Sequence, residues 1–292
     1  MDTQTILQLA TQSLYGMKNK IFDVIDINRP PSSDIALNLV KFNSKLSPLV
    51  ANFIEVETCN FLNQQKHFQN IGVWERQDPD FPDVILNSNI FPSPGFEIKA
   101  WFPLATEMTA RFKDSQNAFL GNQTNVAIIA WLPEFLIYGK PKVIDVFVTS
   151  AQSIAQARDK HYFNPPDYLI TEPLDTSMRT RNLQQSNTSG YKWQSTDSRV
   201  KNEAESLVQN FGDFNSSIQD RQRLVNILMQ SYQYRLDTNY AKLDRINHFQ
   251  INKFINDVYN INIYGRKIRE WYRLFQADEQ AILEGLKNSR LL

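Results

Sequence analysis

Two short apolar runs that carry charged residues constrain the fold of this chain more than any other feature. The first run covers residues 83–87 and opens with Asp83. The second covers residues 95–102 and contains Glu97 and Lys99, with one apolar residue between them. The residues that separate the runs are rich in Pro, Asn and Ser, which are common in turns. This pattern predicts two neighbouring strands joined by a turn.

Two further apolar runs, at 125–132 and 142–149, predict two more strands. Residues 106–119 carry a helical pattern and lie between the second and third predicted strands. The order strand, strand, helix, strand, strand is typical of an α/β fold in which part of the sheet is parallel. We therefore expect a mixed central β-sheet flanked by helices.

The first 65 residues predict helices that precede the sheet. Pro30 and Pro31 end the first helical pattern, because proline in a helix interior removes a hydrogen bond and clashes with the preceding turn. Ser33 is the predicted N-cap of a second helix, and a third helix is predicted at 48–63. These helices form an N-terminal addition to the core.

The chain has 292 residues, enough for one large domain or for one domain with an appended lobe. We expect residues 1–198 to form the core, and residues 199–292 to form a helical lobe of the same globular unit. The pattern of this lobe is helical to the end of the chain, with Trp271, Leu274 and Phe275 at the spacing of a packed helix face.

Charge and composition exclude several classes of protein. The chain carries 31 basic and 31 acidic residues, so a broad basic surface for nonspecific nucleic-acid binding is not expected. The single cysteine, Cys59, excludes an intramolecular disulfide and a cysteine-based zinc site. The histidines, His67, His161 and His248, lie far apart and lack the spacing of metal ligands.

The pattern of apolar residues also bears on localisation. The N-terminus lacks the long apolar stretch of a signal peptide. No run approaches the roughly 18 uninterrupted apolar residues that indicate a membrane span. We therefore expect a cytoplasmic protein with no membrane partner.

The charged residues of the first two runs suit a divalent cation. Carboxylates on neighbouring strands, here Asp83 and Glu97, can bind the same ion, and the backbone carbonyl of Ile98 can supply a third oxygen. Mg²⁺ prefers hard oxygen ligands of this kind and keeps several waters. A bound Mg²⁺ can activate a water and stabilise developing negative charge, as phosphodiester hydrolysis requires.

Strand alternation places Glu97 and Lys99 on the same face. The Lys99 ammonium can therefore orient or help deprotonate the attacking water and neutralise charge in the transition state. The alternative is a solvated strand face, where an acid and a lysine two residues apart are common. The apolar context of the strand favours a functional role, because a charge there is costly unless it is used.

The segments Pro82-Asp83 and Glu97-Ile98-Lys99 together resemble the motif of the PD-(D/E)xK nuclease superfamily, and within it the type II restriction endonucleases. The resemblance implies Mg²⁺-dependent cleavage of double-stranded DNA at a short specific sequence. It further implies that Asp83 and Glu97 are metal ligands and that Lys99 is the catalytic lysine.

The resemblance covers about residues 45–150 as the core of the fold, with helical additions at both ends. Asp78 and Asp80 compete with Asp83 for the first acidic position. Asp83 alone opens the apolar run, so we take Asp78 and Asp80 as loop residues.

Two further positions are implied by the resemblance, and each has an alternative as a plain surface residue. Many members carry a glutamate on a helix before the first core strand. Glu55 lies on a stripe of small and polar residues, whereas Glu57 lies on an apolar stripe, so Glu55 is favoured. A polar residue of the 106–119 helix, Gln116 or Arg111, is implied to lie near the scissile phosphate.

Residues 158–198 form the least regular part of the chain and are rich in Asn, Gln, Arg, Ser and Thr. In the major groove, arginine can bind guanine, and asparagine or glutamine can bind adenine. We therefore expect this region to read bases, the alternative being a polar surface loop. The candidate DNA-binding residues are Arg158, Lys160, His161, Asn164, Arg179, Arg181, Asn182, Gln184, Gln185 and Asn187.

We expect a homodimer, because restriction endonucleases typically read palindromic sites as two-fold symmetric dimers. The resemblance also implies a DNA methyltransferase in the same system, without physical association. Two alternatives stay open. A repair or junction nuclease of the same fold would read DNA shape and be more basic, and a non-catalytic DNA-binding module would retain the sheet without the chemistry.

Overall fold

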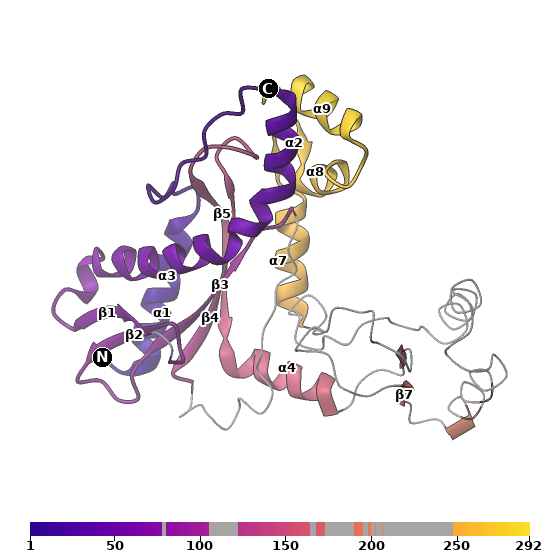
Figure 1. Ribbon diagram of the computed structural model, residues 1–292. Helices are drawn as coiled ribbons and strands as arrows, with labels where there is room; N and C mark the ends of the chain where they lie inside the picture. Colours follow the sequence, from indigo (N-terminus) through magenta and orange to yellow (C-terminus); the bar gives the residue numbers. More distant parts are fainter. Residues whose placement is uncertain are drawn as a thin grey trace.

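A mixed five-stranded sheet with the order β1-β2-β3-β4-β5 forms the centre of the molecule (Figure 1). Its strands are β1 (Gly72–Arg76), β2 (Val84–Ser88), β3 (Gly95–Trp101), β4 (Thr124–Pro133) and β5 (Pro141–Ser150). β3 and β4 are parallel, and the other neighbouring pairs are antiparallel. The predicted α/β class, with a partly parallel sheet flanked by helices, is confirmed.

The computed structural model describes residues 1–77, 80–104, 122–163, 168–172, 190–194, 198, 199, 202, 206 and 248–292. The helix predicted at 106–119 lies outside these residues. The predicted domain boundary at 198–199 falls where only single residues are described, and it stays a prediction.

The four predicted strands correspond to β2, β3, β4 and β5, with ends that differ by at most one residue. The edge strand β1 was not among the predicted strands. In β1 only Trp74 is fully buried, and its flanking residues Val73 and Glu75 are exposed. Nearly every residue of β4 is buried, because β4 lies between β3 and β5 and is covered on both faces.

The helices before the sheet are α1 (Thr3–Leu14), η1 (Tyr15–Met17), α2 (Ser33–Phe42), η2 (Asn43–Leu46), α3 (Ser47–Asn63) and η3 (Lys66–Phe68). The predicted N-cap of α2 was wrong by one residue. Ser32 is the cap, since its Oγ accepts a hydrogen bond from the Ile35 N–H at 3.4 Å, and Ser33 is the first helical residue. Ser32 has extended backbone angles, which an N-cap requires.

α3 also buries a face that differs in part from the one expected. Its buried residues are Val50, Ile54, Thr58, Cys59 and Leu62. Val50 and Ile54 belong to the stripe predicted to be apolar, but Glu57 of that stripe is only half-buried, and the small residues Thr58 and Cys59 lie inside. The small side chains allow the helix to approach the sheet closely.

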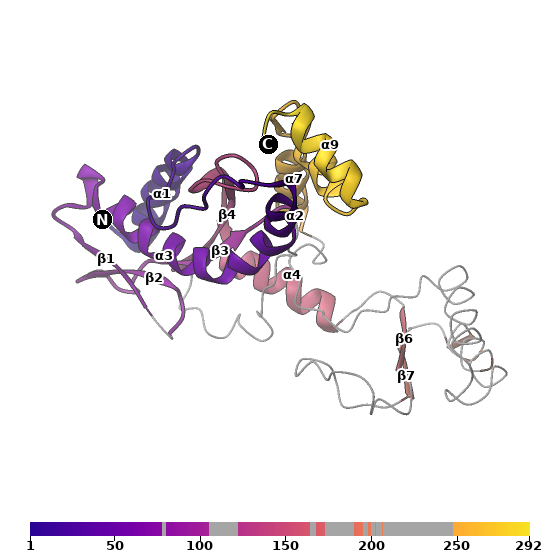
Figure 2. The same ribbon diagram turned by 45° about the horizontal axis from the view of Figure 1, so that its top comes forward.

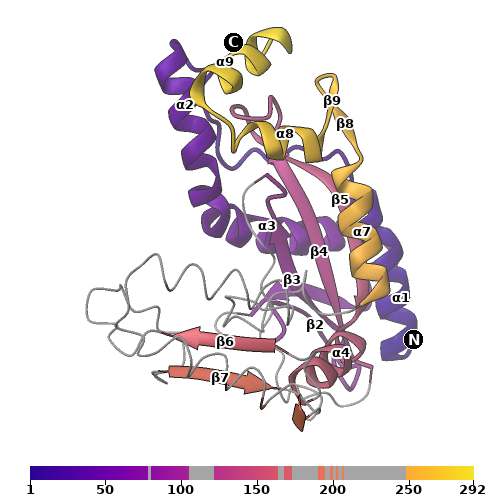
Figure 3. The ribbon, with the colours of Figure 1, turned by 90° about the vertical axis from the view of Figure 1, so that its right-hand side faces the viewer.

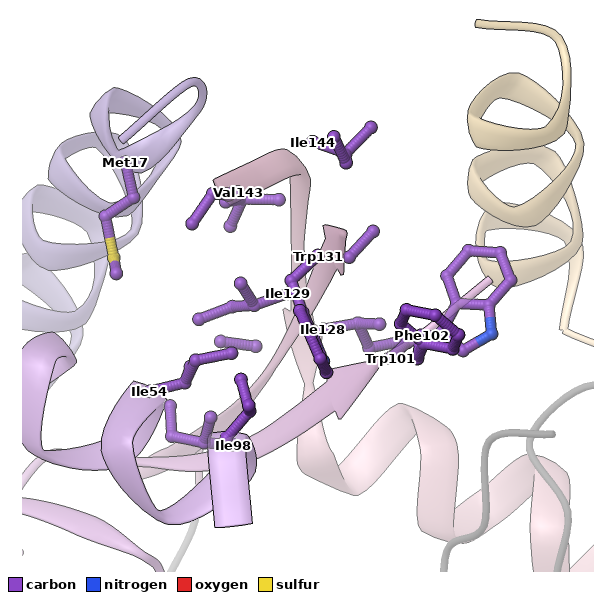
Figure 4. Close-up of a cluster of buried hydrophobic side chains, with 14 of the residues drawn as sticks. Met17, Ile54, Ile98, Trp101, Phe102, Ile128, Ile129, Trp131, Val143 and Ile144 are labelled. Carbon is purple, nitrogen blue, oxygen red and sulfur yellow. The ribbon is translucent and has the colours of Figure 1, made fainter. Parts of the chain in front are cut away.

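Helices cover both faces of the sheet. Met17 of η1 and Ile54 of α3 lie on one side of it, with Ile98 of β3 pointing toward Ile54 (Figure 4). Trp101 of β3 points to the opposite side, where its ring centroid lies 6.1 Å from that of Phe254. The core is therefore double, with one layer of apolar side chains on each side of the strands.

The elements after the sheet are α4 (Ala151–Phe163), β6 (Tyr168–Glu172), β7 (Gly190–Gln194), α7 (Phe249–Tyr259), β8 (Asn262–Ile263), β9 (Arg266–Lys267), α8 (Ile268–Leu274) and α9 (Glu279–Asn288). α7 runs alongside β5 (Figure 3). α2 and α9 lie side by side (Figure 2), where Lys41 Nζ is 2.8 Å from Glu279 Oε1.

One prediction for the second half of the chain was wrong. The C-terminal segment is not helical throughout, because β8 and β9 form a short antiparallel hairpin. Its turn residues Tyr264 and Gly265 both have positive φ, as a tight hairpin of this kind needs. Within 158–198, α4 extends to Phe163 and β6 pairs with β7, so this region contains regular structure. In the described parts of the chain, no helix has the length and apolar character needed to cross a membrane.

Candidate functional site

The strands β2 and β3 separate at the end that carries the acidic residues. Only Val84 with Phe96 and Ile85 with Gly95 are paired between them. Beyond Val84, the Ile98 N–H donates to Asp83 Oδ2 at 2.7 Å. A backbone N–H lies in the plane of the sheet, so the Asp83 carboxylate occupies the gap between the two strands.

The backbone of Asp83 is held from both sides. The Gln77 N–H donates to the Asp83 carbonyl at 2.8 Å, and Gln77 Nε2 donates to the Pro82 carbonyl at 3.1 Å. A Cβ on Gly95 would lie 2.5 Å from Pro82 Cγ and 2.9 Å from the Val84 carbonyl oxygen. Glycine at this position thus allows the Pro82 ring to pack against β3. This packing in turn positions the next residue, Asp83.

Glu97 and Lys99 meet on one face of β3. Lys99 Nζ donates to Glu97 Oε1 at 2.5 Å, and the side chains are only 25% and 12% exposed for Lys99 and Glu97 respectively. The other carboxylate oxygen, Glu97 Oε2, is buried and has no hydrogen-bond partner among the described residues. A buried carboxylate oxygen without a partner is costly, and so it indicates a place for a ligand or a water.

Burial raises the pKa of Glu97, because removing the carboxylate from water penalises its charged form. The nearby Lys99 ammonium opposes this shift, and the charge of Asp83 adds to it. For the pKa of Glu97, the effect of burial therefore outweighs the effect of the Lys99 ammonium.

Glu55 comes from α3 and is fixed by Arg76, at the end of β1. Arg76 Nε donates to Glu55 Oε2 at 2.6 Å, and Arg76 Nη2 donates to Asn52 Oδ1 at 2.6 Å. Burial is the largest cause that raises the pKa of Glu55, the hydrogen bond from Arg76 lowers it, and the charge of Asp83 raises it. Glu57 instead accepts a hydrogen bond from Asn60 Nδ2 at 3.1 Å, one turn further along α3.

The candidate residues therefore fall into two groups joined by Asp83. Alternation along β3 directs Glu97 and Lys99 to the face opposite Ile98, whereas Glu55 reaches the gap from α3 on the Ile98 side. The charge of Asp83 raises the pKa of both Glu55 and Glu97, and the charge of Lys99 lowers the pKa of both, so the two groups interact electrostatically.

The donor atoms at the gap are of the type that Mg²⁺ binds. They are carboxylate oxygens, one of them the unpartnered Glu97 Oε2, together with the Ile98 carbonyl, which lies on the same edge of β3 as the Ile98 N–H. Within the described residues, no three His, Cys, Asp or Glu side chains converge closely enough to hold a metal ion. In this arrangement the carboxylates of Asp83, Glu97 and Glu55 contact Ile98, Lys99 and Arg76 respectively.

The structure does not describe the side chains of most of the other predicted site residues. Gln116 and its alternative Arg111 lie outside the described residues, as does Asp78. Asp80 is exposed in the loop before β2. Of the candidate DNA-binding residues, Arg158, Lys160 and His161 belong to α4, and their side chains lie outside the description. The others also lie outside the described residues, namely Asn164, Arg179, Arg181, Asn182, Gln184, Gln185 and Asn187.

Arg76 and Gln77 were not predicted as members of the site. Arg76 and Glu55 are 21 residues apart, and their contact depends on how α3 packs against an edge strand that was itself missed. The available signal was weak: one buried aromatic, Trp74, followed by two charged residues.

A serine–histidine contact elsewhere does not form a nucleophilic pair. Ser153 Oγ lies 3.0 Å from His248 Nε2, and His248 Nδ1 accepts the Ile251 N–H at the start of α7. Because Nδ1 is an acceptor, the neutral ring carries its proton on Nε2 and donates to Ser153. His248 thus cannot take a proton from Ser153 in this arrangement.

Comparisons of the chain with models of protein families, with curated proteins and with solved structures give no match. The functional argument therefore rests on the chemistry of the gap between β2 and β3.

Proposed function

We propose that this protein is a Mg²⁺-dependent nuclease with a PD-(D/E)xK core, and specifically a type II restriction endonuclease. One observation carries the proposal. At the point where β2 and β3 separate, Asp83 lies in the plane of the sheet beside a buried Glu97–Lys99 pair that has one unpartnered carboxylate oxygen.

In this proposal Asp83, Glu97 and the Ile98 carbonyl hold the cation, which supplies an activated water and charge stabilisation when bound. Lys99 orients the attacking water and offsets the negative charge of the phosphate. Glu55 accepts hydrogen bonds from water at the gap. The two engaged carboxylates, Asp83 and Glu97, each keep a second oxygen, so binding requires side-chain rotation and no change of fold.

The proposed substrate is double-stranded DNA, read within residues 158–194 by arginine and amide side chains. The zero net charge of the chain accords with affinity that depends on local contacts rather than on a broad basic field. We further propose a cytoplasmic homodimer with one site for each strand, in a system whose methyltransferase protects host DNA. Gln116 would contribute near the scissile phosphate.

Incubation of the protein with a large DNA in Mg²⁺, followed by sequencing of fragment ends, tests activity and specificity together. We expect discrete ends, and none when the metal is chelated. Structure-selective nicking would instead favour the repair nuclease, and binding without turnover would favour the non-catalytic module.

The variants Asp83→Ala and Lys99→Ala test the assignment of the site. Loss of either group should slow cleavage by about 10²- to 10⁴-fold, while DNA binding in a gel-shift assay remains. Asp80→Ala is the matched control, because Asp80 is an exposed loop acid close in sequence. Full cleavage by both site variants would refute the assignment.

A further inference from the structure

We propose that Arg76 is a positioning residue of the site, which acts by holding Glu55 at the gap between β2 and β3. This inference rests on the proposed function. It goes beyond the motif, since Arg76 belongs to neither of its two segments and comes from the edge strand β1.

The Arg76 guanidinium makes a forked contact with α3. Two nitrogens of one guanidinium donate to two side chains of α3, Glu55 and Asn52, each at 2.6 Å. Glu55 and Asn52 are three residues apart and so lie on neighbouring turns of one helix face. Arginine presents its donors in a planar and rigid arrangement, so a contact of this kind fixes direction as well as charge.

The position of Arg76 along β1 links Glu55 to Asp83. Arg76 pairs with Val84, and the next residue, Gln77, donates its N–H to the Asp83 carbonyl at 2.8 Å. The end of β1 therefore contacts both residues, the Glu55 carboxylate through the Arg76 side chain and the Asp83 backbone through the Gln77 N–H. A shift of this end would move Glu55 and Asp83 together.

Glu55 needs such an anchor because it comes from a helix and has a flexible side chain. Its side chain is 15% exposed, and the charge of Asp83 acts against its own charge. Arg76 is 28% exposed and offsets that repulsion. Because two nitrogens of Arg76 donate to side chains of α3, we assign it a role that acts through Glu55.

A double-mutant cycle on the cleavage rate tests this assignment. The proteins are wild type, Arg76→Met, Glu55→Gln and the double variant, each at saturating DNA and Mg²⁺ in a single-turnover assay. Loss of an outer residue that orients a site group typically costs about 10- to 100-fold in activity. We expect each single variant to lose about that much, and the double variant to be no slower than the slower single variant.

Independent effects would overturn the inference, since they would multiply in the double variant. A wild-type rate in Arg76→Met or in Glu55→Gln would overturn it as well. If the wild-type protein itself shows no Mg²⁺-dependent cleavage, the proposed function falls and this inference falls with it. Multiplicative effects in an active enzyme refute the inference alone, so the two failures are distinguishable.

Two more variants separate positioning from folding. Arg76→Lys keeps the charge but lacks the fork, so its rate should lie between those of wild type and Arg76→Met. Lys253→Met is the matched control, because it removes a cation from an exposed ion pair with Asp257 and should cleave at the wild-type rate. If Arg76→Met does not fold, Arg76→Lys and Asn52→Ala replace it in the cycle, with thermal unfolding recorded for each.

Discussion

Only one of the two carboxylate oxygens of Glu97 has a hydrogen-bond partner among the described residues. Lys99 engages Oε1, while Oε2 is enclosed without a donor among the described residues. The site residue that would bind an ion is thus also one that weakens the folded protein when no ion is bound. Strained or unmatched groups of this kind are frequent at functional sites.

The pH dependence of stability should report this cost at the residue scale. The raised pKa of Glu97 means that the folded state favours the protonated acid, so its contribution to stability is full below the ordinary pKa and is lost as pH rises through the raised value. Glu97→Gln lacks this titration. In the absence of divalent metal, the stability of Glu97→Gln relative to wild type should therefore increase as the pH rises above the ordinary range of a glutamate pKa.

Urea unfolding of the two proteins over this rise in pH measures the difference directly. A difference that stays constant with pH would show that Glu97 titrates alike in the folded and unfolded chain. Addition of Mg²⁺ gives a second reading, because an ion bound to the folded state alone stabilises it. Wild type should gain more from Mg²⁺ than Glu97→Gln does.

At the scale of elements, the β2–β3 pair depends on the absence of a side chain at Gly95. A Cβ there would approach Pro82 Cγ to 2.5 Å and the Val84 carbonyl oxygen to 2.9 Å. Gly95→Ala should therefore destabilise the protein by about 1–3 kcal/mol, as overpacking does. It should also reduce cleavage, because the strands that carry Asp83 and Glu97 are forced apart.

Gly16→Ala provides the control for this substitution. A Cβ on Gly16 would meet only the Phe61 ring, at 3.4 Å, so its stability in urea unfolding should stay within about 0.5 kcal/mol of wild type. Equal stability of Gly95→Ala and Gly16→Ala would contradict the close packing of Pro82 on β3.

The start of α2 allows a second test at this scale. Ser32 accepts the Ile35 N–H, whereas Ser33 is inside the helix. Ser32→Ala should lower the free energy of unfolding by about 1 kcal/mol, and Ser33→Ala should change it by less than about 0.5 kcal/mol. A larger loss of stability in Ser33→Ala than in Ser32→Ala would indicate that Ser33 is the N-cap, as the sequence pattern predicts.

The agreement and the differences between predicted and observed elements have physical reasons. β2 to β5 were predictable because each is an apolar run bounded by turn residues. β1 has a single buried side chain, Trp74, so its pattern carries little signal. The N-cap could not be assigned by residue type, since Ser32 and Ser33 are chemically equal and only the backbone angles distinguish them.

The contacts of the candidate site also divide into those that local sequence patterns predict and those that they do not. Alternation along one strand sufficed to bring Glu97 and Lys99 together. The contact of Asp83 with the Ile98 N–H required knowledge of where β2 and β3 separate, and the contact of Arg76 with Glu55 required the packing of α3 on β1. Local periodicity does not encode either of these relations.

At the scale of the whole molecule, the C-terminal helix α7 packs directly against the sheet. Phe254 of α7 stacks on Phe147 of β5 with ring centroids 5.4 Å apart, and it also contacts Trp101 of β3. α7 is thus part of the second core layer. Helices joined to the sheet through buried aromatic rings should unfold together with it.

Phe254→Ala tests this cooperativity. Loss of the buried ring should lower the free energy of unfolding by about 3–5 kcal/mol, in a transition that fluorescence and circular dichroism report at the same urea concentration. Phe249→Ala is the control on the same helix, because Phe249 is 79% exposed. Two separate transitions in wild type would show that the C-terminal helices fold as an independent unit.

The position of Asp83 in the plane of the sheet has a consequence for how such a chain can change over generations. Its carboxylate substitutes for a backbone acceptor at the Ile98 N–H. A lineage that no longer needed the chemistry could replace Glu97 and Lys99 together at little structural cost. Replacement of Asp83 would leave a buried N–H without its acceptor, at a cost of about 1–3 kcal/mol. Of Asp83, Glu97 and Lys99, Asp83 should therefore be retained longest in descendants that have lost activity, because the fold still needs its carboxylate.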